Sequence, residues 1–187
     1  HTNAVFGFLN IMFKIIDSKQ PDYMAVAFDV HQPTFRHEMF KDYKGTRKPM
    51  MEELREQVPV IKELLQKMNI TTVELPGYEA DDVIGTLSKK GEKAGMEVDV
   101  ISGDRDLLQL ASDHITICIP KTKKGQTTVE EYNTEGVRKL YKVTPTEFID
   151  VKALMGDSSD NIPGVPGIGE KGATAIISQF GSIENAY

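Results

Sequence analysis

Eight acidic residues fall into four short clusters along the chain, and their types and spacing suggest metal chemistry. The clusters are Asp29; Glu79, Asp81 and Asp82; Asp104 and Asp106; and Asp157 and Asp160. Eight like charges gathered in one place would repel one another unless cations lay among them. Carboxylate oxygens favour hard divalent ions such as Mg²⁺ or Mn²⁺. Two such ions can drive an in-line displacement at a phosphate.

Each acidic cluster also has a purely structural interpretation when it is taken alone. The stretch "GYEADD" places acids in the first turn of an expected helix, where the helix dipole favours them. Asp104 could cap the short helix that follows it, and "DSSD" could form a turn or a cap. A single aspartate after a strand, such as Asp29, is commonplace. Only the joint pattern therefore indicates a metal site.

The composition restricts the class of protein. The chain has 187 residues, of which 40% are hydrophobic and 27% charged, as in a globular domain. Its single cysteine, Cys118, fits a reducing cytoplasm, no run is apolar enough to span a membrane, and no zinc motif is present. The net charge of −6 becomes +2 when the eight clustered acids are set aside, which suits a protein that handles phosphates around an acidic centre.

Short apolar runs alternate with helical patterns, which predicts an α/β layered fold with a largely parallel sheet. The expected strands are 23–29, 71–75 and 97–102, followed by a hairpin of 115–120 and 127–132 around a basic turn. The expected helices are 3–17, 34–44, 50–68, 79–94, 134–141, 145–155 and 169–180, with a short helix after Asp104. Pro59 should kink or interrupt the 50–68 segment. Acids follow each of the first three strands, so we expect them at one edge of the sheet.

The stretch "FRHEMFKDYKGTRK" (35–48) interleaves cations with aromatic residues. A helix there would align Arg36, Phe40 and Lys44 on one face. Cations neutralise phosphates and aromatic rings stack on unpaired bases, although an ordinary solvated helix would show the same composition. The position of the stretch just after Asp29 favours the nucleic-acid interpretation.

The stretch "IPGVPGIGEKGATAIISQFG" predicts a turn, a hairpin and a helix. Glycines allow close approach of the backbone, and the start of a helix offers free N–H donors to an anion. Backbone donors would hold phosphate whatever the base sequence, although a tight turn between helices is the alternative. Its place directly after "GDSSD" suggests that one nucleic-acid strand touches both the acids and this loop.

Five motifs together resemble the 5′-nuclease domain of bacterial DNA polymerase I, a member of the flap endonuclease superfamily. They are "AFD", "FRHEMFKDYKGTR", "GYEADDVIGTL", "GDRDLLQL" and "ALMGDSSDNIPGVPGIGEK". They cover nearly the whole chain in order; "GDSSDNIPGVPGIGEK" is very specific, whereas "AFD" is weak by itself. The resemblance implies a PIN-like three-layer core with a mainly parallel sheet over 1–142, a helical arch at about 30–50, and a helix–three-turn–helix DNA-binding module over 143–187.

The resemblance also implies site residues. The metal-site positions are Asp29, Glu79, Asp81, Asp104, Asp106, Asp157 and Asp160. Asp82 matches an acidic position to which the resemblance gives no function. Lys44 and Arg47 match arch residues that face the scissile phosphate. Positions expected to contact DNA are Arg36, Tyr43, Lys48, Gly164, Gly167, Gly169 and Lys171, and in relatives the hairpin also holds a potassium ion.

The implied activity is structure-specific cleavage of DNA 5′ ends and 5′ flaps with two Mg²⁺ or Mn²⁺ ions, in RNA-primer removal and repair. The implied partners are DNA with a 5′ flap, a nick or a 5′ end, RNA-primed DNA, and a polymerase domain in the same chain. The protein is expected to be cytoplasmic and monomeric. One departure is that a first strand bearing an aspartate in a "DG" setting would precede Thr2, so we expect the chain to be part of a longer protein. A free-standing nuclease remains open.

Two other functions compete with this one. A non-catalytic DNA-junction binder of the same fold would gain nothing from so many mutually repelling acids. A PIN-type ribonuclease would not need the hairpin that follows Asp160.

Overall fold

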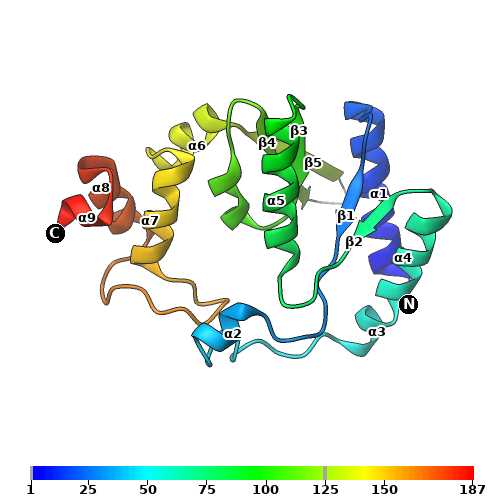
Figure 1. Ribbon diagram of the computed structural model, residues 1–187, viewed down its shortest axis with the longest axis horizontal. Helices are drawn as coiled ribbons and strands as arrows, with labels where there is room; N and C mark the ends of the chain where they lie inside the picture. The colour runs from blue at the N-terminus through cyan, green and yellow to red at the C-terminus, as the bar shows by residue number, and fades with distance from the viewer. Residues whose placement is uncertain (1, 124–125) are drawn as a thin grey trace. The chain divides into compact units, whose positions relative to one another are not determined.

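The computed structural model describes residues 2–123 and 126–187, and their packing divides the chain into two compact units. Unit 1 comprises His1–Phe35 and Lys48–Val83, and unit 2 comprises Arg36–Arg47 and Ile84–Tyr187. Each unit has a sheet of its own (Figure 1). Within the described residues, no helix combines the length and the apolar character needed to cross a membrane.

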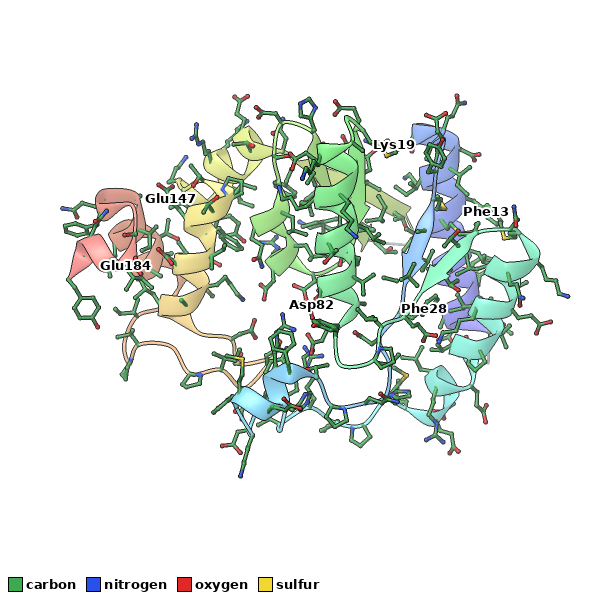
Figure 2. All side chains as sticks on the ribbon, in the orientation of Figure 1. Phe13, Lys19, Phe28, Asp82, Glu147 and Glu184 are labelled. Carbon is green, nitrogen blue, oxygen red and sulfur yellow. The ribbon has the colours of Figure 1, made fainter. Side chains whose placement is uncertain are left out.

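Unit 1 is a small parallel sheet covered by helices. Its strands are β1 (Ala25–Ala27) and β2 (Thr71–Val73), and its helices are α1 (Asn3–Lys19), α3 (Glu52–Arg55) and α4 (Gln57–Lys67). Met12, Ile61 and Leu65 form the buried centre between α1 and α4, and Phe28, labelled in Figure 2, packs against it from just beyond β1. This packing positions the end of β1, where Asp29 follows.

The helical segment 50–68 is interrupted near Pro59, as predicted, although the break lies just before the proline. The break lies at Glu56, between α3 and α4, and Pro59 is the third residue of α4. Backbone N–H groups in the first turn of a helix have no partner within the helix, so a proline there removes no hydrogen bond. The proline ring also obstructs helical structure in the turn that precedes it, so the break at Glu56 agrees with the predicted effect of Pro59.

Unit 2 contains a three-stranded mixed sheet in the order β3-β4-β5. Its strands are β3 (Val98–Ile101), β4 (Ile115–Lys123) and β5 (Gln126–Tyr132). The expected hairpin is confirmed by the antiparallel pairing of β4 with β5, while its basic turn at 124–125 lies outside the described residues. The described residues thus form two sheets and not the single sheet that was expected. The β1–β2 and β3–β4 pairs are parallel, as predicted, and β4–β5 is antiparallel because a short hairpin connection permits only that pairing.

Three helices of unit 2, namely α6 (Thr134–Tyr141), α7 (Pro145–Met155) and α8 (Glu170–Phe180), lie close to their predicted ranges, and η1 (Arg105–Leu110) is the expected short helix after Asp104. Helix α9 (Ile183–Ala186) was not predicted, while α5 (Ala80–Lys93), close to the predicted 79–94, begins in unit 1. Local signals explain the starts. The side chain of Asn133 accepts from Gly136 N at α6, and Thr144 forms a capping box with Glu147, labelled in Figure 2, at α7.

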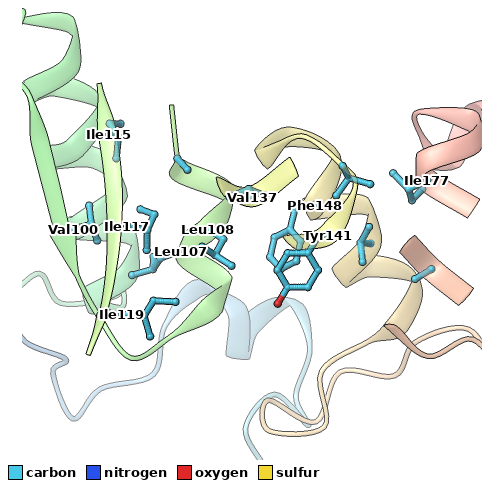
Figure 3. Packing of buried hydrophobic residues seen from close by; sticks show 14 of the residues in the cluster. Val100, Leu107, Leu108, Ile115, Ile117, Ile119, Val137, Tyr141, Phe148 and Ile177 are labelled. Atoms are coloured by element: carbon cyan, nitrogen blue, oxygen red, sulfur yellow. The ribbon is translucent and has the colours of Figure 1, made fainter. Parts of the chain in front are cut away.

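One hydrophobic core joins the sheet of unit 2 to its C-terminal helices (Figure 3). Ile117 of β4 and Leu108 of η1 are fully buried, and so is Ile177 of α8. The rings of Tyr141 and Phe148 lie 4.7 Å apart between α6 and α7. Because η1 and α7 share this core, the acids of η1 and those that follow α7 are held near each other.

The expected helix over 34–44 is much shorter in the structure. Helix α2 (Phe35–Met39) is followed by turns, so Arg36, Phe40 and Lys44 do not share one helical face. Lys44 has a left-handed φ of 55°, and its N–H donates to Asp160 O at 2.8 Å instead of to a preceding turn. A contact distant in sequence has taken the donor that a continuing helix would need.

Replacing Gly164 by alanine is expected to destabilise the fold by about 2–4 kcal/mol, because a close approach of two backbone segments leaves no room. A Cβ on Gly164 would lie 2.3 Å from the carbonyl carbon of Met155 and 2.5 Å from the nitrogen of Gly156. Urea denaturation would measure the loss. Gly172→Ala is the control, since its Cβ would lie 3.5 Å from Ile168 Cγ2, and equal stability of both variants would contradict the prediction.

Candidate active site

The acids of unit 1 meet where β1 and β2 end. Asp29 Oδ1 accepts a hydrogen bond of 2.7 Å from the backbone N–H of Ala80, so the structure brings Asp29 to the start of α5 as the sequence predicted. Asp82 lies in the first turn of α5 (Figure 2), and its Oδ2 accepts from Glu79 N at 3.0 Å. Asp82, to which the sequence assigned no function, thus caps this helix. Glu79 is only 9% exposed.

Asp104 and Asp106 lie at the start of η1 in unit 2. The side chain of Asp104 accepts a 2.8 Å hydrogen bond from Asp106 N, so the capping interpretation of Asp104 is confirmed. That bond uses Oδ1 of Asp104, and the Asp106 side chain itself contacts a lysine of α7. Capping and ion binding are compatible, because a carboxylate offers more lone pairs than one N–H can use.

The "DSSD" segment forms a tight loop that is organised by Asp157. Asp157 Oδ1 accepts from Ser159 N at 2.8 Å, from Ser159 Oγ at 2.6 Å and from Asp160 N at 3.2 Å. The backbones of Asp157 and Ile162 exchange two hydrogen bonds of 2.8 Å, which close the loop. The turn interpretation of "DSSD" is therefore confirmed. The other carboxylate oxygen of Asp157, Oδ2, has a different partner.

That oxygen contacts Lys152, a residue that the motif analysis did not single out. Lys152 Nζ lies 2.8 Å from Asp157 Oδ2 and 2.9 Å from Asp106 Oδ1, so one ammonium group joins acids from two clusters. The side chain is 24% exposed. Its signal in the sequence was weak: a lysine in the last turn of a helix is commonplace, and only its place five residues before Asp157 was suggestive.

The protonation equilibria of the three groups reflect this contact. Burial raises the pKa of Asp106 and outweighs the effect of Lys152. Burial also opposes ionisation of Asp157, but hydrogen bonds from Lys152 and Ser159 outweigh it and hold the pKa of that carboxyl far below its usual range. Burial lowers the pKa of Lys152, yet the two carboxylates raise it above its ordinary value. The arrangement therefore favours a positive charge between the two acids.

Lys152→Met is expected to lower the free energy of unfolding by about 1–2 kcal/mol in EDTA, an estimate that allows for partial exposure of the three groups. Two partly buried carboxylates would then face each other without a cation. Added Mg²⁺ should stabilise the variant more than the wild type, because an ion would no longer compete with the ammonium group. Urea denaturation with and without Mg²⁺ would measure both effects. The exposed Lys139→Met is the control, and equal responses to Mg²⁺ in all three proteins would contradict the prediction.

The basic turn, defined here as residues 42–47, lies against the "DSSD" loop. Tyr43 Oη donates to Asp160 Oδ2 at 3.1 Å, and Arg47 forms an ion pair with the other oxygen of the same carboxylate. Tyr43 is only 5% exposed; His37 meets its ring edge-on, and Lys44 Nζ lies 5.1 Å from its centre. A buried ring offers little surface for stacking on a base, so DNA contact by Tyr43 stays a prediction.

The remaining predicted DNA-contact residues differ in their surroundings. Gly167 has a φ of +82° with open space where a side chain would be, so its chain conformation favours glycine. Gly169 caps α8 without a side-chain acceptor, and Lys171 is exposed in the first turn of that helix. Arg36 is partly buried, and Lys48 is exposed and belongs to unit 1.

The predicted convergence of the eight clustered acids is seen only in parts. Asp29 meets the 79–82 segment in unit 1, and Asp106 shares Lys152 with Asp157 in unit 2. Across residues 2–123 and 126–187, no three histidine, cysteine or acidic side chains gather closely enough to hold a metal ion. Ligation by these acids therefore remains a prediction.

Comparison with protein families matches the whole chain. Residues 1–142 match the family described as "5'-3' exonuclease, N-terminal resolvase-like domain", and residues 143–187 match "5'-3' exonuclease, C-terminal SAM fold". DNA polymerase I from Bacillus caldotenax is 55% identical over 99% of this chain, and that from Bacillus subtilis is 55% identical over 98%. The chain spans only 21% of the length of each of these relatives.

Solved structures agree with this assignment. The T5 5′-exonuclease with bound zinc ions is 28% identical and has a TM-score of 0.76, over 96% of this chain and 68% of its own. The bacteriophage T5 flap endonuclease, in a pseudo-enzyme-product complex with DNA and metal ions, is 27% identical with a TM-score of 0.76, over 96% and 68% of the two chains. The chain belongs to the 5′–3′ exonuclease family, which includes the nuclease region of bacterial DNA polymerase I.

Proposed function

We propose that this chain is the nuclease part of a structure-specific 5′-nuclease that hydrolyses phosphodiester bonds at DNA 5′ ends and 5′ flaps with two divalent ions. The observation that carries the proposal is that Asp106 and Asp157 both contact the ammonium group of Lys152. The "DSSD" loop, which contains Asp157, also contacts the basic turn through Asp160. Acidic side chains that attract a cation and basic side chains that attract a phosphate thus lie within unit 2.

The acids of unit 2 suit divalent ions in their chemistry. Their ligand atoms are carboxylate oxygens, and two of the carboxylates already contact a positive group that stands in for an ion. Asp104, Asp106, Asp157 and Asp160 would hold Mg²⁺ or Mn²⁺ in unit 2, and Asp29, Glu79 and Asp81 are the further predicted ligands. When bound, two such ions activate a water molecule and stabilise the attacking and leaving oxygens.

The basic turn and the hairpin would handle the substrate. Lys44 and Arg47 would neutralise charge on the scissile phosphate. Backbone N–H groups around Gly167 and Gly169 would hold a duplex phosphate at the start of α8, where Lys171 adds a positive charge. Such contacts do not distinguish bases, which suits an enzyme that recognises DNA structure. A potassium ion in the hairpin, as in relatives, is part of the same proposal.

The full-length relatives suggest the setting of this activity. DNA polymerase I is about five times longer than this chain, which covers 21% of it, so a polymerase domain in the same protein is proposed. Nicks, 5′ flaps and RNA-primed DNA would be substrates in cytoplasmic replication and repair, with the protein acting as a monomer. The T5 flap endonuclease solved with DNA and metal ions supports the substrate class.

A non-catalytic DNA-junction binder is the second candidate. A binder would gain nothing from so many mutually repelling acids, among them Asp106 and Asp157, which lie close enough to share Lys152. Cleavage of a labelled 5′-flap duplex by the full-length protein, with Mg²⁺ or EDTA, separates the two candidates. Mg²⁺-dependent release of the flap would support the nuclease, whereas tight binding without cleavage would support the binder.

A further inference from the structure

All three oxygens of Asp160 accept hydrogen bonds from the basic turn. Tyr43 Oη contacts Oδ2 at 3.1 Å, Arg47 Nη2 contacts Oδ1, and the backbone N–H of Lys44 contacts the carbonyl oxygen at 2.8 Å. The Asp160 side chain is only 18% exposed, although that of Arg47 is 49% exposed. One residue thus receives three donors from a stretch of five.

Neighbouring contacts repeat the same pairing of turn and loop. Arg47 Nε donates to Ser159 O at 3.1 Å, and Asn161 Nδ2 donates to Asp42 O at 2.8 Å. Lys44 and Asn161 both adopt left-handed backbone conformations, with φ of 55° and 58°. Asparagine adopts this backbone conformation readily and lysine less often, and at Lys44 it accompanies the hydrogen bond from the backbone N–H to Asp160 O.

We propose that Asp160 is a positioning residue that docks the basic turn, and with it Lys44 and Arg47, in the metal-free protein; the inference rests on the proposed cleavage. The same carboxylate is a predicted metal ligand, and a divalent ion at Asp160 would repel Arg47 and compete for its oxygens. Docking of the turn and ion binding at Asp160 therefore oppose each other. By thermodynamic linkage, each weakens the other by the same factor.

Amide hydrogen exchange on the full-length protein without DNA tests the docking. Asp160→Asn should speed exchange of the amides of residues 43–47 by at least about tenfold, because local opening becomes easier once the ion pair is lost. Ser158→Ala, an exposed change in the same loop, is the control and should leave exchange unchanged. Unchanged exchange in Asp160→Asn would show that the carboxylate does not hold the turn.

The response to Mg²⁺ is the second measurement, and a contact that only stabilises the fold would not change with Mg²⁺. Mg²⁺ without DNA should speed exchange of the same amides in the wild type, and Arg47→Met should bind Mg²⁺ several-fold more tightly by calorimetry. Slower exchange with Mg²⁺, or unchanged affinity in Arg47→Met, would overturn the competition. Neither measurement depends on turnover, so failure of flap cleavage and failure of this inference are distinguishable.

Discussion

Asp104→Asn and Asp157→Asn are each expected to lower the single-turnover rate of Mg²⁺-dependent 5′-flap cleavage by the full-length protein about 10³-fold or more. Loss of one anionic ligand weakens the ions that stabilise the attacking and leaving oxygens, and these contribute several kcal/mol to the transition state. DNA affinity should change little, because the acids are proposed to hold ions and not DNA.

Asparagine is the informative substitution because both aspartates also organise the backbone. Asp104 accepts from Asp106 N, and Asp157 accepts from Ser159 N and Asp160 N, so alanine would disturb the fold as well as the charge. An amide oxygen can keep these acceptors while the negative charge is lost. Asp113→Asn, the same change at an exposed position in unit 2, is the control. Normal turnover in both site variants would refute the two-ion mechanism.

Lys44→Met is expected to slow the single-turnover rate about 10²-fold while changing the dissociation constant for flap DNA less than about threefold. A cation that meets charge developing on the phosphate acts mainly in the transition state, so its loss affects the rate more than binding. The backbone of Lys44 should stay in place, because its N–H contact with Asp160 does not use the side chain.

The control for Lys44 is Lys41→Met, which removes an exposed lysine near the same turn. A lysine that only attracts DNA should show a modest loss of affinity that disappears at high salt, with an unchanged single-turnover rate. Rapid-quench measurements on both variants would separate the two effects. If Lys44→Met lost affinity at an unchanged rate, Lys44 would be a docking contact and not a catalytic residue.

The sequence by itself determined helices α6, α7 and α8 and the family of the chain. Thr144 and Glu147 form the capping box at α7, and the predicted ranges of α6 and α7 agree with the structure. Such signals act over three or four residues, so they are legible in the order of the amino acids. The motif around "GDSSDNIPGVPGIGEK" is equally local, and the comparisons confirm the family that it indicated.

Tertiary structure decided how the site residues are paired and where local patterns stop. Tyr43 and Asp160 are 117 residues apart in the sequence, yet their side chains are in contact. The basic segment that contains Tyr43 does not continue as a helix, and the N–H of Lys44 donates to Asp160 O instead. Lys152 joins Asp106 to Asp157 because η1 and α7 share one hydrophobic core. No periodicity encodes such pairs, since they depend on which distant segments the core brings together.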